Sequence, residues 1–209
     1  LTGRSSVRIR PAALLIYKCD YADKIADYVR DDFAVLPADT LYALSISIFS
    51  ENSKRIYSLK GRSSSIPVPV GVYDLESIEK IAFINEFLNK ILSRDWSYLV
   101  TVVLKNRSVP EHIAKETVGI RIPRNEIIRK IIKRVGPVTL TSANLHGGKN
   151  PINVIDAYEQ LGDKIKYYLD CGPCSGIPST VIDLTKEKPK LIREGAIPFS
   201  WVMDLYGTK

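Results

Sequence analysis

Apolar side chains recur at helical spacing in several segments of the chain. Between residues 20 and 30 they fall on one face of a helix that Asp20 can cap, and residues 126–135 form an amphipathic segment with basic side chains on its outer face. Residues 75–92 are also helical, with a break near 83–85. The predicted helices span 20–30, 53–59 (ending at Gly61), 75–92, 126–135 and 154–161.

Short apolar runs rich in β-branched residues lie between these helices, and SYLVTVVLK at 97–105 is the clearest of them. Because helices alternate with strands and some strands follow one another directly, the pattern indicates an α/β fold with a mixed sheet. No repeat or linker interrupts it, so we expect a single domain. The predicted strands span 14–18, 33–37, 68–73, 97–105, 118–122, 138–141, 179–184 and 190–192.

Composition and charge narrow the class of protein. The 209 residues, 45% of them hydrophobic, can bury a full core, and no run approaches the ~18 apolar residues of a membrane helix. We therefore expect no membrane partner, and the absence of a signal-peptide pattern favours a cytoplasmic protein. A net charge of +7 favours a polyanionic partner, such as a nucleotide or nucleic acid. The basic residues at 129–134 are expected to form a solvated helix face.

The chain has three cysteines, Cys19, Cys171 and Cys174, and CGPC at 171–174 has the spacing of a thiol redox motif. That chemistry needs the first thiol at a helix N-terminus, whereas SGIP follows here. A zinc site would need further ligands that are not grouped in the sequence. We expect a buried thiol pair or a local disulfide, with redox catalysis as an alternative.

Small polar residues gather where predicted strands end, notably in KGR (60–62) and TSAN (141–144). Open α/β sheets bind ligands in the loops that follow the ends of their strands. In KGR, an ammonium and a guanidinium flank a glycine, which suits phosphate, although a helix C-terminus at Gly61 explains the same residues. Walker A, GxGxxG, HExxH and nucleophile-elbow patterns are absent from the sequence.

Five motifs occur in the order PADTLYAL, KGR, GIRIP, TSAN and STVIDL with IREG. In this order and at these spacings they resemble the YrdC-like threonylcarbamoyl-AMP synthases, over about residues 36–195. The resemblance implies a twisted mixed sheet flanked by helices around a concave basic cavity. It also implies one YrdC-like domain over 1–209, with the motif-bearing region at about 14–195 and no additional C-terminal domain.

The reaction implied by the resemblance converts L-threonine, bicarbonate and ATP, with magnesium, into threonylcarbamoyl-adenylate and pyrophosphate. A separate transferase complex then modifies an adenosine of tRNA, so tRNA or double-stranded RNA is a further candidate partner. Such a reaction needs alignment and charge neutralisation rather than a side-chain nucleophile.

Carried over residue by residue, the resemblance also implies a set of site residues. Arg121 would pair with the threonine carboxylate, and Lys60 and Arg62 would hold the ATP phosphates as the catalytic residues. Thr40, Arg121, Ser142 and Ser179 are assigned to threonine, and Lys60, Arg62, Thr117, Asn144 and Arg193 to the nucleotide, with Ser142 and Asn144 bridging the two.

Several positions depart from the family pattern. Ala38 and Ala43 replace a threonine and a glycine, Ser63 and Ile66 replace a proline and a polar residue, and Gly71 stands where a histidine often occurs. These changes leave open an altered amino-acid specificity, or a protein that binds a nucleotide or RNA without turnover.

Overall fold

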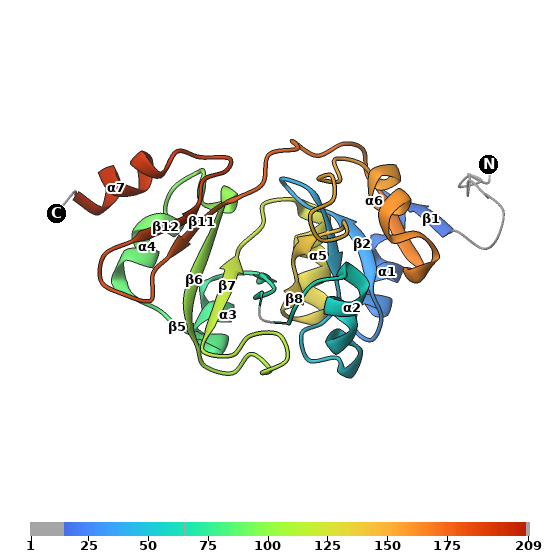
Figure 1. The fold of residues 1–209 in the computed structure, drawn as a ribbon, viewed down its shortest axis with the longest axis horizontal. Coiled ribbons are helices and arrows are strands. Elements are labelled where there is room, and N and C mark those ends of the chain that lie inside the picture. Colours follow the sequence, from blue (N-terminus) through green and yellow to red (C-terminus); the bar gives the residue numbers. More distant parts are fainter. Residues whose placement is uncertain (1–14, 65, 208–209) are drawn as a thin grey trace.

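The computed structural model describes residues 15–64 and 66–207. Its strands form two mixed sheets that lie side by side along the molecule, with α7 (Phe199–Gly207) at one end and β1 (Leu15–Lys18) at the other (Figure 1). The α/β class with helices around a mixed sheet is therefore confirmed. The division into two sheets differs from the single sheet that the sequence predicts.

The first sheet has five strands in the described part of the chain. Its order is β1, β10 (Tyr167–Asp170), β2 (Ala34–Pro37), β3 (Tyr42–Ser45) and β9 (Thr141–Ser142). The first three strands run parallel, whereas β3 is antiparallel to both of its neighbours. Every residue of β2 and β3 is buried, as expected for strands covered on both faces.

The second sheet has seven strands among the described residues and is also mixed. The pairs β11–β6 and β4–β7 are parallel, and the remaining pairs are antiparallel. Its order is β12 (Lys190–Arg193), β11 (Thr180–Asp183), β6 (Val100–Asn106), β7 (Thr117–Arg121), β4 (Val70–Gly71) and β8 (Val138–Thr139), and β5 (Ala82–Phe83) pairs with β6.

One short segment joins the sheets. Val138 and Thr139 pair with β4 of the second sheet, and Thr141 and Ser142 pair with β3 of the first. The buried hydroxyl of Thr139 accepts from the backbone N–H of Ile46 (3.1 Å) and donates to the carbonyl oxygen of Leu44 (3.1 Å). The TSAN motif therefore begins at the seam between the two sheets.

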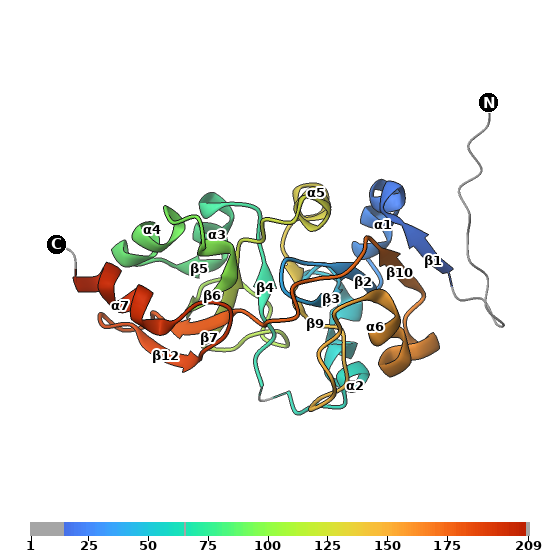
Figure 2. The ribbon, with the colours of Figure 1, turned by 90° about the horizontal axis from the view of Figure 1, so that it is seen from above.

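Helices cover the sheets on both sides. α1 and α5 lie together on one side of the first sheet, and α2 and α6 lie on the other (Figure 2). No helix in residues 15–64 and 66–207 is long and apolar enough to cross a membrane. The helices are α1 (Ala22–Val29), α2 (Ile56–Lys60), α3 (Leu75–Ile81), α4 (Glu86–Leu92), α5 (Glu126–Val135), α6 (Val154–Leu161) and α7, with short 3-10 turns at Cys19–Tyr21, Glu51–Arg55, Ser97–Leu99 and Gly162–Lys164.

The apolar faces of α1 and α5 pack against the first sheet, as their sequence periodicity predicts. The basic face of α5 is not left bare: Lys130 pairs with Asp23 and Arg134 with Asp27, both at 2.8 Å. These contacts agree with a solvated helix face at 129–134 rather than with an anion-binding patch. The buried positions are Ala22, Ile25, Ala26 and Val29 in α1, and Ile128, Ile131, Ile132 and Val135 in α5.

Some predicted boundaries are wrong and several elements were missed. Asp20 lies in a 3-10 turn and makes no cap, because α1 begins at Ala22 without a side-chain cap. The helix predicted at 75–92 is broken as expected, with β5 between α3 and α4. Gly61 ends α2 in the left-handed conformation that a C-terminal glycine favours (φ 61°). The elements that the sequence did not predict include β3, β5, β10 and α7.

The cysteines pair differently from the expectation of a local bond. Cys19 and Cys171 form a disulfide between the ends of β1 and β10, whereas Cys174 is a free thiol. β1 and β10 are parallel neighbours, and Lys18 lies opposite Asp170 in the last pair of the register. Cys19 and Cys171 follow directly after these two residues, so they also lie opposite each other. The prediction of a local disulfide between Cys171 and Cys174 is therefore wrong.

Lys60, at the end of α2, is buried with 3% of its surface exposed. Its ammonium group donates to the carbonyl oxygens of Ser142 and Asn144 (2.8 Å for Asn144) and to Asn144 Oδ1 (3.2 Å). Three N–H donors thus meet three oxygen acceptors. Burial, and then the nearby Arg62, lower the pKa of Lys60 to about 7.

Reduction of the disulfide is expected to lower the free energy of unfolding by about 2–5 kcal/mol, because the bond constrains a long loop of the unfolded chain. The two cysteines are 152 residues apart in the sequence. Denaturant unfolding with and without reductant measures the effect, and Cys174→Ser, which keeps the disulfide, is the control. Identical midpoints in both conditions would contradict the prediction.

The lowered pKa of Lys60 predicts a pH-dependent stability. Above pH 7 the folded state releases a proton that the unfolded state keeps up to the ordinary lysine pKa of 10.5. Stability therefore rises with pH in this window, by roughly 1 kcal/mol per unit between pH 7 and 9. We expect this rise in the wild-type protein relative to Lys60→Met, measured by urea unfolding at several pH values. Parallel pH profiles for the two proteins would exclude it.

Candidate active site

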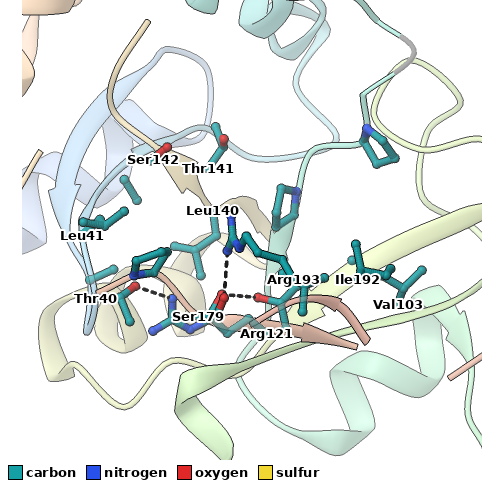
Figure 3. Close-up of a pocket in the computed structure, with 18 of the residues that line it drawn as sticks. Thr40, Leu41, Val103, Arg121, Leu140, Thr141, Ser142, Ser179, Ile192 and Arg193 are labelled. Carbon is teal, nitrogen blue, oxygen red and sulfur yellow. Dashed lines mark hydrogen bonds between the residues drawn. The ribbon is translucent and has the colours of Figure 1, made fainter. Parts of the chain in front are cut away.

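A cavity of about 670 Å³ lies where the two sheets meet, a volume typical of small-molecule sites. Its walls come from segments distant in the sequence: the loop before β3, the residues after α2, the strands β6 and β7, the seam at 140–142, and the segment 178–193. Thr40, Arg121, Ser142, Ser179 and Arg193 all appear around it in Figure 3.

Arg121, at the end of β7, forms the floor of this cavity and is 6% exposed. Its guanidinium donates in three directions: Nε to the carbonyl oxygen of Tyr98 (2.7 Å), Nη1 to Thr40 Oγ1 (2.8 Å) and Nη2 to Asp39 Oδ2 (3.1 Å). Burial lowers the pKa of Arg121, while Asp39 acts in the opposite direction. The side chain is thus held rigidly and stays a cation.

Arg62 lines another part of the cavity wall. Its Nη2 donates to the carbonyl oxygen of Pro67 (3.1 Å), and its guanidinium carbon lies 5.7 Å from the centre of the Tyr57 ring. Its Nε is buried without a hydrogen-bond partner in the described structure. A buried donor without a partner is costly, and because this Nε has almost no exposed surface, a ligand atom reaches it only after the side chain moves.

Ser179 and Arg193 meet on a third wall. The hydroxyl of Ser179 is 2.8 Å from that of Thr101, and Arg193 Nη2 donates to the carbonyl oxygen of Ser179 (2.8 Å; Figure 3). A Cβ added at Gly195 would lie 2.2 Å from the carbonyl oxygen of Pro178. The glycine of IREG is therefore required by the close approach of the backbone to the Pro178–Ser179 segment.

Ser142 lines the cavity, whereas Asn144 and Lys60 lie behind it. Ser142 Oγ donates to Asn144 Oδ1 (2.6 Å), and Asn144 Nδ2 donates to the carbonyl oxygen of Gly148 (2.9 Å). Lys60 holds the same loop from the other side through the three bonds described above. In this structure KGR and TSAN thus contact each other, and Lys60 and Asn144 fix the loop that presents Ser142.

Most of the residues expected at the site are brought together. Seven of them line the cavity and two, Lys60 and Asn144, do not. Thr101 was missed, although Thr101 and Val103 of β6 both line the cavity, so the two-residue periodicity of the strand was the available signal. The seven are Thr40, Arg62, Thr117, Arg121, Ser142, Ser179 and Arg193; Thr141 of TSAN also lines the cavity, and the missed polar residues are Thr101, Asn150 and Asp183.

The departure at Gly71 has a steric explanation. A Cβ at this position would lie 3.2 Å from Leu140 Cδ2 and 3.3 Å from Ile132 Cδ1. Leu140 itself lines the cavity. An apolar side chain therefore occupies the wall beside Gly71, and any side chain larger than glycine would have to displace it.

The CGPC loop, taken here as residues 171–176, lies next to the floor of the cavity. Gly176 N donates to the carbonyl oxygen of Thr40 (2.9 Å), and the Cys174 thiol donates to that of Ala38 (3.1 Å). Burial raises the pKa of Cys174. Because a thiolate is the reactive form and Cys171 is already bonded to Cys19, the loop supports the position of Thr40 and does not form a redox pair.

Comparison with known proteins places this geometry in a family. The family model of the Sua5/YciO/YrdC domain, described as "Telomere recombination", matches residues 29–195. A Methanocaldococcus jannaschii protein, provisionally named threonylcarbamoyl-AMP synthase, is 36% identical over 183 residues, covering 84% of this chain and 87% of that protein. A Pyrococcus abyssi protein named threonylcarbamoyl-AMP synthase is 33% identical over 190 residues, covering 87% of this chain and 56% of that protein.

Solved structures agree with the sequence relatives. The crystal structure of Pyrococcus abyssi Sua5 complexed with L-threonine has a TM-score of 0.87 at 30% identity, covering 92% of this chain and 61% of that chain. Escherichia coli YciO shares the fold, with a TM-score of 0.80 at 22% identity over 89% of this chain and 98% of that one. The chain thus spans about three-fifths of the P. abyssi protein. By sequence and by structure, the chain belongs to the Sua5/YciO/YrdC family.

Proposed function

We propose that the chain is a threonylcarbamoyl-AMP synthase, an enzyme that forms threonylcarbamoyl-adenylate and pyrophosphate from L-threonine, bicarbonate and ATP. The observation that carries the proposal is the convergence of Thr40, Arg121, Ser142 and Ser179 on one cavity. The relative with a TM-score of 0.87 is described as a complex with L-threonine. Arg62 and Arg193 add positive charge to the same cavity, which suits a triphosphate.

In the proposed complex the amino acid lies on the floor. The fork of Arg121 is suited to the threonine carboxylate, because a guanidinium offers parallel N–H donors to two oxygens. The guanidinium of Arg62, which lines the cavity, is suited to a phosphate oxygen. Ser142 donates its proton to Asn144, so its oxygen remains free to accept a hydrogen bond from a ligand N–H or O–H.

The proposed chemistry needs no protein nucleophile. Bicarbonate takes up a proton and loses water to give carbon dioxide, and the amine of threonine adds to this carbon dioxide and loses a proton. An oxygen of the resulting carbamate then attacks the α-phosphorus of ATP as pyrophosphate leaves. The protein aligns the two reactants, which can contribute ~7–11 kcal/mol to lowering the barrier. Arg62 and Arg193 reduce the repulsion between the incoming carbamate and the phosphates.

Magnesium enters this proposal as part of the Mg·ATP substrate. In residues 15–64 and 66–207 no three His, Cys, Asp or Glu side chains form a group that could hold a metal ion. Magnesium commonly binds through substrate phosphates, waters and one or two carboxylates, and Asp183 is a carboxylate on the cavity wall.

The product of the proposed reaction is an intermediate for the modification of tRNA. The threonylcarbamoyl group passes to tRNA through a separate transferase complex, and we place this process in the cytoplasm. The Cys19–Cys171 disulfide would then have to persist in a reducing compartment, where disulfides are rare.

The central test is a turnover assay with purified protein, L-threonine, bicarbonate and Mg·ATP. We expect pyrophosphate release that depends on both threonine and bicarbonate, with threonylcarbamoyl-adenylate identified by mass spectrometry. Pyrophosphate release that is independent of threonine, or absent, would overturn the proposal. In that case nucleotide or RNA binding without turnover, the second candidate that the basic charge and the altered PADTLYAL loop favour, would be tested by salt-dependent RNA titration.

Arg62→Met is expected to raise the KM for ATP about 10- to 100-fold, because a charge-assisted hydrogen bond contributes ~1.5–3 kcal/mol. The thermal midpoint should fall only slightly, since the substitution removes one hydrogen bond to Pro67 and the contact with the Tyr57 ring. Arg134→Met is the matched control: this arginine pairs with Asp27 on the outer face of α5, away from the cavity. Equal effects of the two substitutions would show that Arg62 is not a ligand of ATP.

A further inference from the structure

Asp39 is a buried carboxylate that does not line the cavity. Its side chain is 7% exposed, and both oxygens accept hydrogen bonds. Oδ1 accepts from the backbone N–H of Asn125 (2.6 Å) and of Arg124 (3.1 Å), and Oδ2 accepts from Arg121 Nη2 (3.1 Å). The carboxylate therefore joins the loop before β3 to the end of β7 and to the turn that begins α5.

These bonds fix the guanidinium of Arg121. Of its five N–H donors, three are used by Tyr98, Thr40 and Asp39, which leaves two (5 − 3) for a ligand. The acceptors come from two segments of the chain, Tyr98 and the 39–40 loop, so the plane of the guanidinium cannot rotate without breaking at least one bond. The two remaining donors are thus held in one orientation before any ligand arrives.

The same network sets the direction of the Thr40 hydroxyl. Thr40 Oγ1 accepts a hydrogen bond from Arg121 Nη1, so its lone pairs are partly used and its own proton remains to be donated. Thr40 lines the cavity. The floor therefore presents donors from both residues, which is the arrangement that a carboxylate requires.

The Asp39–Arg121 pair also affects how charge is distributed around the cavity. Asp39 and Arg121 form a buried ion pair with no net charge, so the floor offers hydrogen bonds without excess positive charge. Among the described residues that line the cavity, the other cations are Arg62 and Arg193, which lie on other walls. A triphosphate and an amino-acid carboxylate would accordingly prefer different walls of the same cavity.

We propose that Asp39 is a positioning residue that holds Arg121 and Thr40 as a neutral, preorganised donor set for the carboxylate of the amino-acid substrate. The inference rests on the proposed function and adds to it the division of the cavity into a neutral floor for the amino acid and cationic walls for the nucleotide.

Asp39→Asn tests the role with little change of shape. The Asn oxygen can still accept from the backbone N–H of Asn125, but its amide NH2 cannot accept from Arg121. We expect the KM for L-threonine to rise at least tenfold and the KM for ATP to change less than twofold. The control is Asp23→Asn, which replaces an exposed carboxylate paired with Lys130 and should change neither constant. A similar rise in both KM values, or in neither, overturns the proposal.

A double-mutant cycle with Arg121→Lys separates positioning from a structural effect on the α5 turn. If Asp39 acts through Arg121, Asp39→Asn weakens threonine binding far less in the Arg121→Lys background than in the wild type. Additive losses in calorimetric titrations would show that Asp39 acts independently of Arg121 and would overturn the inference.

A readout without turnover keeps this inference distinct from the proposed function. In side-chain 1H–15N spectra, the fixed guanidinium of Arg121 should give resolved, slowly exchanging N–H signals, assigned by their loss in Arg121→Lys. Asp39→Asn should average these signals. Unchanged signals would overturn the positioning role whether or not the protein makes threonylcarbamoyl-adenylate, whereas an inactive wild-type protein with averaged Asp39→Asn signals would overturn only the proposed function.

Discussion

Residues 138–142 hydrogen-bond to both sheets within one short stretch of chain, and the cavity depends on this seam. β8 pairs with β4 on one side, and β9 pairs with β3 on the other. Thr139 adds bonds to Ile46 and Leu44, and Leu140 donates its N–H to the carbonyl oxygen of Pro69 (2.7 Å). A short extended segment leaves the two sheets little freedom to move relative to each other. The seam therefore fixes the distance and the angle between them. Side chains from both sheets can then face one ligand.

Buried charge holds the cavity walls in place. Lys60 and the Asp39–Arg121 pair are almost fully buried, and a buried charge is tolerated only when its partners are well placed. Lys60 meets three oxygens of the 142–144 loop, and Asp39 meets three donors from β7 and the α5 turn. Burying these charges is costly for stability, so their presence is explained by the fixed positions that they give to neighbouring residues of the cavity wall.

The structure also explains why certain motifs occur together. Lys60 of KGR and Asn144 of TSAN are 84 residues apart in the sequence, yet they are bonded directly. The two motifs therefore occur together because they contact each other in the folded protein. The CGPC loop has a comparable role, since its backbone supports Thr40 and its first cysteine is bonded to Cys19.

The sequence by itself determined the α/β class, the limits of α5 and α6, the faces of α1 and α5, and seven residues that line the cavity. Local periodicity and motif order carry that information, because they depend on neighbours along the chain. Only the tertiary structure decided that β3 and β10 are strands, that the strands form two sheets, that Cys19 pairs with Cys171, and that Lys60 and Asn144 lie behind the wall. Each of these depends on contacts between residues far apart in the sequence, such as the 152-residue separation of the disulfide, and such contacts leave no local pattern.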